Sequence, residues 1–443
     1  MKQAPGLKIA FYDPSGRGGI CQYTFQLAQS LAESGCDVTV LTTDGYELQH
    51  LPRSFRLVVV FKKSVVKNWL AKIAGTQAKS SSRTEPAPEN GGRVAIETTR
   101  WNLACWLKKL RLRLIFLKTF AYLLWHRPHV IHFQWLASRD EDLYFIGWLK
   151  RFGFPIVYTA HDLLPHDADT PAARSFFQKI YTVADRLVVH AESIRHEMVE
   201  LFHINPDKIW VVSHGSNILF SASSKEAARA RLEIASDKKV ILFFGLIKRY
   251  KGLEYLLEAF EQIRAQVEGA VLLIAGSIAD EDKVTYAYYR NLLLRFAGDQ
   301  SVKCRTEYIP LEQAGDFFSA ADVVALPHVK PSQSGVLLSA IAAGKPVVVT
   351  DAGGFTEVIE NGRSGFVVPP GHPKALAEAL VRIFQTNGLL QSMGKEAKAL
   401  ADTNYSWRTI AARTVHLYHS LLMPLSPHDG KTALGRSEVR IHE

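Results

Sequence analysis

The stretch from residue 331 to residue 362 combines turn glycines, hydroxyl side chains and a carboxylate in a pattern that could bind an anion. Within it, the run 336–343 is apolar nearly all round, which predicts a short buried helix that ends at Gly344. Ser334 and Gly335 stand at the amino end of this helix, where unpaired amides and the positive end of the helix dipole favour a phosphate. The chemistry indicated is the binding of a nucleotide diphosphate.

A buried strand and a second glycine turn follow this helix. Residues 346–350 read PVVVT, an apolar run typical of a strand in a parallel sheet, and the glycine turn 351–354 comes directly after it. Thr356 and Glu357 open a further short helix. This order places a polar loop at the carboxyl end of a strand, which is the edge where open α/β sheets bind their ligands.

Three cations follow another predicted strand, 238–245. Lys248, Arg249 and Lys251 lie just beyond its carboxyl end. Such a cluster suits a diphosphate whose negative charge grows as it leaves. Any one of the three could instead be an ordinary solvated side chain, and it is their grouping at this edge that favours the functional interpretation.

A glycine-rich turn lies between the first predicted strand, 8–12, and the helical pattern 20–34. Gly18 and Gly19 belong to this turn, where backbone can approach a ligand closely. The spacing is not GxGxxG, because Cys21 takes the place of the third glycine, so a dinucleotide site is disfavoured. A merely tight turn would use the same glycines.

The elements that position these residues alternate between strand and helix patterns in both halves of the chain. We therefore predict an α/β fold of two doubly wound parallel-sheet domains, residues 1–216 and 217–404. Further strands are expected at 37–43, 130–135, 155–160, 186–191, 209–215, 270–276 and 322–327. The polar stretch 75–98 reads as a disordered loop, and 427–443 reads as a flexible tail.

The net charge of +10 over 443 residues is concentrated in one region. Residues 62–127 hold fourteen Lys and Arg against three Glu, a balance of +11, so the remainder sums to −1. This indicates one basic surface rather than a protein that coats nucleic acid, and no nucleic-acid-binding motif accompanies the charge.

The four cysteines are scattered, without the spacing of a disulfide framework or a zinc site, and no secretory signal pattern opens the sequence. A cytoplasmic protein is expected.

The segment 101–126 interleaves bulky apolar residues with lysines and arginines. Its charge-free runs are far shorter than the ~20 residues that a spanning helix needs. Two interpretations stay open: a helix that lies on an anionic membrane surface, or a long domain helix with a solvated basic face.

Several stretches in order resemble the retaining glycosyltransferases of family 4. The matching runs include GRGGICQYTFQLAQSLAESGCDVTVLT, VYTAHDLLPH, GLIKRYKGLEYLLEAF and SGVLLSAIAAGKPVVVTDAGGFTEVIENG. The resemblance covers roughly residues 8–418 and implies the GT-B fold, in which two Rossmann-like domains face each other and the C-terminal one holds the sugar nucleotide. It also implies that residues 405–423 form a closing helix that returns to the N-terminal domain.

The resemblance further implies roles for individual residues. Gly18 and Gly19 would approach the donor phosphate, Lys251 would bind the pyrophosphate, and His161 in TAHD would contact the donor sugar near the reaction centre. The family's arginine is replaced here by Leu246, so Lys248 or Arg249 would substitute for it.

The two glutamates that many members of this family carry around the phosphate helix are absent. Ser334 and Ser339 stand at their places. The chain resembles a subgroup that reads QSGV here, which makes Gln333, Ser334, Gly335 and Val336 donor-site residues and raises the question of whether Glu357 takes part.

The function implied is the retaining transfer of a hexose from a nucleotide-diphosphate sugar to a hydroxyl of a glycan or lipid-linked glycan, without cofactor or metal. A metal-dependent transferase would need an acidic DxD site, and three acidic triplets, 140–142, 167–169 and 280–282, are expected to be solvated surface. A sugar-nucleotide epimerase and a noncatalytic scaffold of the same fold remain alternatives.

Overall fold

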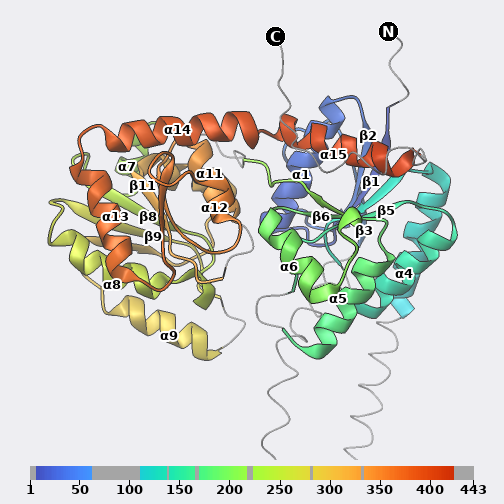
Figure 1. Ribbon diagram of the computed structural model, residues 1–443, viewed down its shortest axis with the longest axis horizontal. Coiled ribbons are helices and arrows are strands. Elements are labelled where there is room, and N and C mark those ends of the chain that lie inside the picture. Colours follow the sequence, from blue (N-terminus) through green and yellow to red (C-terminus); the bar gives the residue numbers. More distant parts are fainter. Residues whose placement is uncertain are drawn as a thin grey trace, which may run out of the picture.

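The computed structural model describes residues 6–61, 110–136, 139–164, 169–216, 223–279, 283–330 and 334–423. These form two α/β domains that stand side by side (Figure 1). The predicted segments 75–98 and 427–443, and residues 101–109 of the basic segment, lie outside the described residues.

The N-terminal domain is built on a seven-stranded parallel sheet in the order β3-β2-β1-β4-β5-β6-β7. Its strands are β1 (Lys8–Tyr12), β2 (Asp37–Thr43), β3 (Arg56–Phe61), β4 (Val130–Phe133), β5 (Ile156–Thr159), β6 (Arg186–Val189) and β7 (Ile209–Val211). The central strands are apolar runs because helices cover both faces of the sheet. The helices are α1 (Gly18–Glu33), a helix over residues 110–126, α4 (Arg139–Arg151), α5 (Pro171–Val183), α6 (Glu192–Phe202) and the 3-10 turn η1 (Pro206–Lys208).

The C-terminal domain repeats this architecture with a six-stranded parallel sheet in the order β10-β9-β8-β11-β12-β13. Its strands are β8 (Lys239–Phe244), β9 (Ala270–Ala275), β10 (Val302–Arg305), β11 (Val323–Leu326), β12 (Val347–Thr350) and β13 (Gly365–Val368). Its helices are α7 (Lys225–Arg231), η2 (Arg249–Lys251), α8 (Leu253–Arg264), α9 (Lys283–Leu294), α10 (Leu311–Ala320), α11 (Gly335–Ala342), α12 (Phe355–Val358), α13 (Pro373–Gln385) and α14 (Leu389–Asn404). Two separate cores, one on each face of the sheet, fill the domain. The predicted pair of doubly wound sheets is confirmed.

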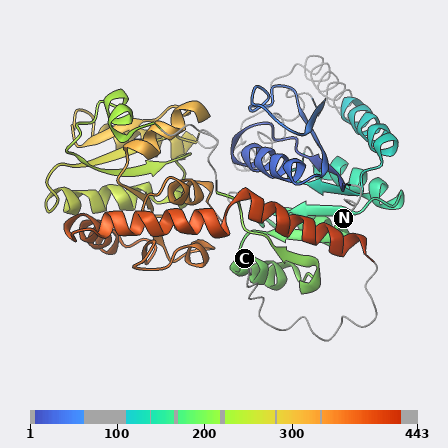
Figure 2. The ribbon, with the colours of Figure 1, turned by 90° about the horizontal axis from the view of Figure 1, so that it is seen from above.

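The last described helix, α15 (Trp407–Leu422), returns to the N-terminal domain. It packs on α1, and its residues Ile410, Ala411, Leu417 and Tyr418 are buried in the core that contains strand β1. Figure 2 shows α14 and α15 in red, running one after the other from the C-terminal to the N-terminal domain. The predicted closing helix is therefore present. Over the residues described, no helix is long and apolar enough to cross a membrane.

Candidate active site

The two domains meet through loops that follow the carboxyl ends of their strands. Tyr308, beyond β10, donates a hydrogen bond to Glu47, beyond β2, and the Arg17 guanidinium lies 5.4 Å from the centre of the Tyr308 ring. Glu357, beyond β12, reaches the start of α6, beyond β6. The carboxyl edges of both sheets thus border the space between the domains, as expected for a ligand site in such folds.

Lys251 lies at the end of η2, in the loop that leaves β8. Only 8% of Lys251 is exposed. A Cβ placed on Gly245 would lie 3.2 Å from Nζ of Lys251 and 3.5 Å from Cγ2 of Val336. The ammonium and the first turn of α11 therefore converge over the same glycine. Among the described residues, the Lys251 ammonium has no carboxylate or hydrogen-bond acceptor. Burial, reinforced by nearby Lys248, lowers the pKa of Lys251 to about 8.

The turn that holds Lys251 is fixed by glycine. Gly252 has φ 66°, and an added Cβ there would meet the Pro327 carbonyl oxygen at 2.1 Å. The neighbouring cations differ in setting: Lys248 is half-buried, whereas Arg249 is exposed and its guanidinium lies 5.8 Å from the centre of the Tyr288 ring in α9.

The start of α11 is open to a ligand. Ser334 is its N-cap and is buried, but its side chain makes no capping bond to the helix. Among the described residues, no atom lies within 4 Å of a Cβ added to Gly335. Ser339 donates its hydroxyl to the Gly335 carbonyl at 2.8 Å, so its Oγ is used within the helix. Gln333 lies outside the described residues.

Gly18 and Gly19 begin α1, and a Cβ added to either would meet no atom of the described chain within 4 Å. The space is open, but the Gly18 N–H already donates to Oε2 of Glu47 at 2.8 Å. A carboxylate of the protein itself thus stands at the helix end where a donor phosphate was expected. Glu47 is a feature that the sequence interpretation missed.

His161 follows β5 and has both ring nitrogens engaged. Nδ1 lies 3.2 Å from Nε2 of His190, and Nε2 lies 3.0 Å from the Gln134 side chain. Because Nδ1 of His190 must donate to the Val212 carbonyl at 2.9 Å, Nε2 of His190 is an acceptor and Nδ1 of His161 carries the proton. Burial and the neighbouring imidazoles lower the pKa of His161 well below its ordinary value, so the ring is neutral.

The orientation of the Gln134 amide follows from this tautomer. With its oxygen toward His161, the amide nitrogen is buried without a partner in the part of the chain described. Turned over, the nitrogen donates to Nε2 of His161, and the donors and acceptors from Gln134 to Val212 are consistent.

A cluster of rings surrounds this chain of hydrogen bonds. Tyr23 of α1 contacts the rings of His161, His190, His214 and Trp407, with ring centroids 4.9–5.3 Å apart. The sequence did carry a signal for these residues: Gln134, His161 and His190 each come one or two residues after an apolar strand, and such ends meet at one edge of a parallel sheet.

Glu357 faces the N-terminal domain. Its carboxylate accepts the backbone N–H groups of Glu192 at 2.6 Å and Ser193 at 2.8 Å, at the amino end of α6. Two charge-assisted bonds and the helix dipole favour the contact.

No group of three or more metal-ligating side chains occurs among the described residues. The expectation that the triplet 140–142 is solvated was wrong for Asp142, which is buried and accepts the Tyr12 hydroxyl at 2.5 Å. The reason is that Asp142 shares the inner face of α4 with Phe145 and Leu149, where the tyrosine satisfies it. Asp169 pairs with exposed Arg174, and 280–282 lie outside the described residues.

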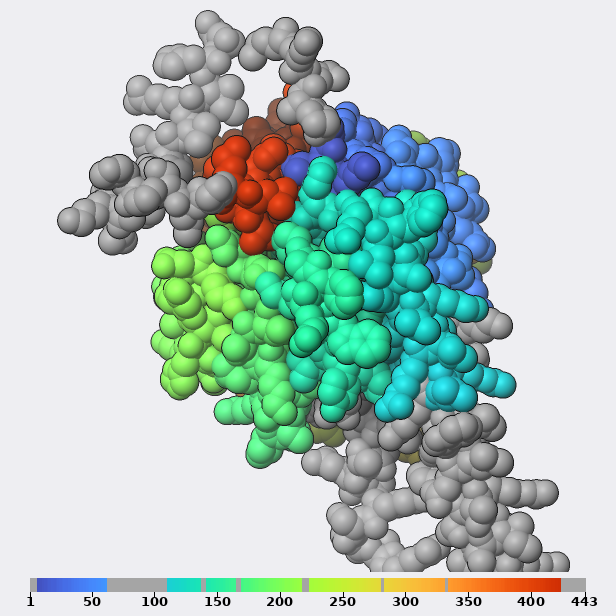
Figure 3. Space-filling view, turned by 90° about the vertical axis from the view of Figure 1, so that its right-hand side faces the viewer, coloured from blue at the N-terminus to red at the C-terminus, as the bar shows by residue number. Residues whose placement is uncertain are grey.

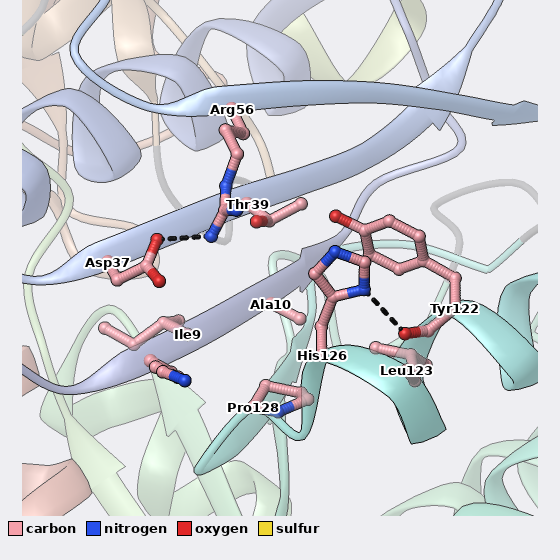
Figure 4. Close-up of a pocket in the computed structure, with 10 residues that line it drawn as sticks. Ile9, Ala10, Asp37, Thr39, Arg56, Tyr122, Leu123, His126 and Pro128 are labelled. Carbon is pink, nitrogen blue, oxygen red and sulfur yellow. Dashed lines mark hydrogen bonds and ion pairs between the residues drawn. The ribbon is translucent and has the colours of Figure 1, made fainter.

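A small hollow elsewhere in the N-terminal domain is not part of this site. Figure 4 shows it at the amino ends of β1 and β2, crossed by an Arg56–Asp37 ion pair of 2.6 Å and bordered by His126. This is the edge opposite to the ligand-binding edge of a parallel sheet.

Comparison with known proteins agrees with this arrangement. Residues 18–215 match the family described as glycosyl transferase 4-like domain, and residues 238–386 match glycosyl transferases group 1. A D-inositol 3-phosphate glycosyltransferase of Streptomyces scabiei is 31% identical over 314 residues, 66% of this chain and 69% of the relative. One of Thermobispora bispora is 29% identical, over 67% of this chain and 71% of the relative. The chain belongs to the group 1 glycosyltransferases.

Solved structures show the same fold. Anabaena Alr3699/HepE in complex with UDP superposes with a TM-score of 0.69 at 17% identity, covering 94% of this chain and 100% of that one. Sucrose-phosphate synthase from Thermosynechococcus elongatus gives a TM-score of 0.67 at 20% identity over 94% and 99% of the two chains. This group 1 glycosyltransferase therefore has the expected GT-B architecture.

In this glycosyltransferase the structure brings Lys251, Gly245 and the start of α11 together. It places His161, Gln134 and His190 in one hydrogen-bonded group on the N-terminal domain. A buried cation beside the first amides of a helix can stabilise a departing diphosphate. A neutral, oriented imidazole can hydrogen-bond a sugar hydroxyl that displaces the Gln134 amide.

Proposed function

We propose that the protein transfers a hexose from a nucleotide-diphosphate sugar to a hydroxyl of a glycan or lipid-linked glycan, with retention of anomeric configuration and without a metal or cofactor. The observation that carries the proposal is Lys251. A buried ammonium without a carboxylate partner in the described residues, facing the first turn of α11, needs an anion to offset its desolvation.

The donor class is supported by relatives and by geometry. Structural neighbours were solved with UDP and with UDP-glucose, and the relatives named above are glycosyltransferases. The pyrophosphate would lie between Lys251 and the amides of Gly335 and Val336, with Ser334 beside it. We class the chain with the QSGV variants, in which Gln333 and these residues replace the usual glutamates at the donor.

Catalysis in such a site rests on positioning and on charge. As the sugar–phosphate bond breaks, Lys251 and the α11 amides stabilise the negative charge of the leaving diphosphate. Either Lys248 or Arg249 would contribute a second positive charge. His161 would orient the sugar from the opposite domain. The acceptor oxygen then bonds to the anomeric carbon on the face that the diphosphate leaves, which retains the configuration, and the hydroxyl proton passes to the departing phosphate oxygen.

The test is calorimetric titration with UDP, GDP and ADP in the presence of chelator. We expect saturable binding of one nucleotide, which Lys251→Ala loses and the exposed control Lys395→Ala keeps. Release of the nucleotide from its sugar donor should then require an acceptor. Conversion of the donor without an acceptor would favour the epimerase instead, and no binding of any nucleotide would favour a noncatalytic scaffold.

A further inference from the structure

The helix over residues 110–126 is apolar on two opposite faces. One face is buried: Leu112, Phe116, Phe120 and Leu123 pack into the core behind the N-terminal sheet. This packing explains one half of the helix. It does not explain why leucines and a tryptophan also occupy the other half.

The outer face of the same helix carries an exposed apolar stripe. Leu110, Leu114, Leu117 and Trp125 are 40%, 49%, 53% and 86% exposed. Their spacing of four, three and eight residues puts them on one side of a helix, opposite the buried set. A solvated helix would place polar residues there, so this stripe indicates a contact with something outside the described chain.

The neighbouring helix α4 continues the apolar surface. Tyr144 is 73% exposed, and Trp148 and Phe152 are 53% and 51% exposed, again at intervals of four. The ring of Phe120 lies 6.1 Å from that of Trp148 and 4.9 Å from that of Phe152, which joins the two helices side by side. We call the two stripes together the outer face of the N-terminal domain.

Basic residues border the outer face. Arg111, Arg113 and Lys118 are exposed beside the leucine stripe, and Arg151 is exposed beside Trp148. Residues 110–127 contain no acidic side chain. Figure 3 looks onto this side of the domain, where the cyan and turquoise atoms of the two helices form much of the surface.

We propose that the outer face binds an anionic lipid bilayer. Exposed aromatic and leucine side chains enter the boundary between headgroups and acyl chains, and cations at their edge attract acidic headgroups. A second copy of the chain fits less well, because it would bring two arginine-rich rims together. The inference does not depend on the proposed transfer reaction, since binding is measured without donor or acceptor.

The experiment is cosedimentation of the full chain with phosphatidylcholine vesicles, with and without phosphatidylglycerol. We expect retention only where phosphatidylglycerol is present, and release at about 1 M salt, where the screening length falls to about 3 Å. The charge variant Arg111→Gln/Lys118→Gln should lower the partition coefficient by about fivefold for each cation removed. The apolar variant Trp125→Ser/Tyr144→Ser should lower it at least about tenfold.

Matched controls come from the C-terminal domain. Val284→Ser/Leu294→Ser removes comparably exposed apolar side chains from α9, and Arg290→Gln/Lys395→Gln removes two exposed cations; both should leave retention unchanged. Circular dichroism checks that the variants fold. Failure of the wild-type chain to bind acidic vesicles at low salt would overturn the proposal. Vesicle binding that both outer-face variants retain would also overturn it. So would a chain that does not bind vesicles but forms a dimer in light scattering, if the apolar variant dissociates that dimer.

Discussion

The carboxylate of Glu357, in the C-terminal domain, accepts the backbone N–H of Ser193, in the N-terminal domain, at 2.8 Å. The adjacent N–H of Glu192 binds the other oxygen. One side chain thus closes the amino end of α6 from across the space between the domains, and it ties the domains together.

Removal of this carboxylate should loosen the pair of domains. Glu357→Ala loses two charge-assisted bonds and a favourable helix-dipole contact, which for exposed partners amounts to about 1–2 kcal/mol. We expect small-angle scattering of the variant without ligand to show a larger radius of gyration. The control Glu360→Ala breaks an ion pair with Arg363 inside one domain and should leave the profile unchanged. Identical scattering from both variants would show that the contact does not hold the domains.

Nucleotide affinity should fall as pH rises through the pKa of Lys251. Burial holds that pKa at about 8 in the folded protein, below the ordinary lysine value, so the ammonium is largely present at pH 7 and largely lost above pH 9. A bound diphosphate stabilises the ammonium and raises the pKa. Binding above pH 8 must therefore take up a proton, and the dissociation constant should rise by up to about tenfold per pH unit.

Calorimetry in buffers of different ionisation enthalpy measures this proton directly. Proton uptake near pH 9 that disappears at pH 6.5 is the expected result. An affinity independent of pH between 7 and 9.5 would mean that Lys251 does not carry the phosphate contact.

The fold could be predicted because strands that are buried on both faces of a sheet consist of continuous runs of apolar residues. The expected strands 130–135 and 186–191 appear as Val130–Phe133 and Arg186–Val189. Three strands, β3, β10 and β13, were not anticipated. In β3 and β10 several side chains are partly or fully exposed, and VKCR lacks the apolar run that a central strand shows. β13 is a run of only four residues, GFVV, that begins with a glycine.

The proximity of some candidate residues could be predicted for a similar reason. Lys251 and Val336 each follow a strand whose end can be recognised from the local sequence, and the structure brings their side chains together over Gly245. The contacts of Glu47 with Gly18 and Tyr308, and of Glu357 with α6, join residues far apart in the chain. No local pattern specifies which helix a distant carboxylate will cap, so these contacts needed the structure.

Gly276 and Gly245, which follow neighbouring strands, approach each other so closely that we expect Gly276 to tolerate no side chain. Gly276 has φ 136°, and an added Cβ would meet the Gly245 carbonyl oxygen at 2.2 Å. We expect Gly276→Ala to cost about 2–4 kcal/mol of unfolding free energy and to displace the loop that carries Lys251. Gly298→Ala is the control, because it has φ 86° but no atom within 4 Å, and should cost only about 1 kcal/mol. Equal urea midpoints for the two variants would contradict the close approach.

The last prediction concerns His190, which we assign as a positioning residue for His161. His190→Phe keeps an aromatic ring but removes the acceptor of the His161 Nδ1 proton. That proton should then move to Nε2, where the Gln134 amide can turn back to accept it with its oxygen, and nitrogen NMR of His161 should report the change of tautomer. Loss of one buried hydrogen bond, about 1–3 kcal/mol, should lower kcat about tenfold to hundredfold without weakening nucleotide binding.

His214→Phe separates this role from packing. His214 also contacts Tyr23 and is equally enclosed, but its Nδ1 binds the Gly215 carbonyl rather than His161. The control should leave the His161 tautomer and kcat nearly unchanged, even if it lowers the unfolding temperature. If both variants lose kcat alike and neither shifts the His161 nitrogens, the ring cluster stabilises the domain and His190 has no special part in orienting His161.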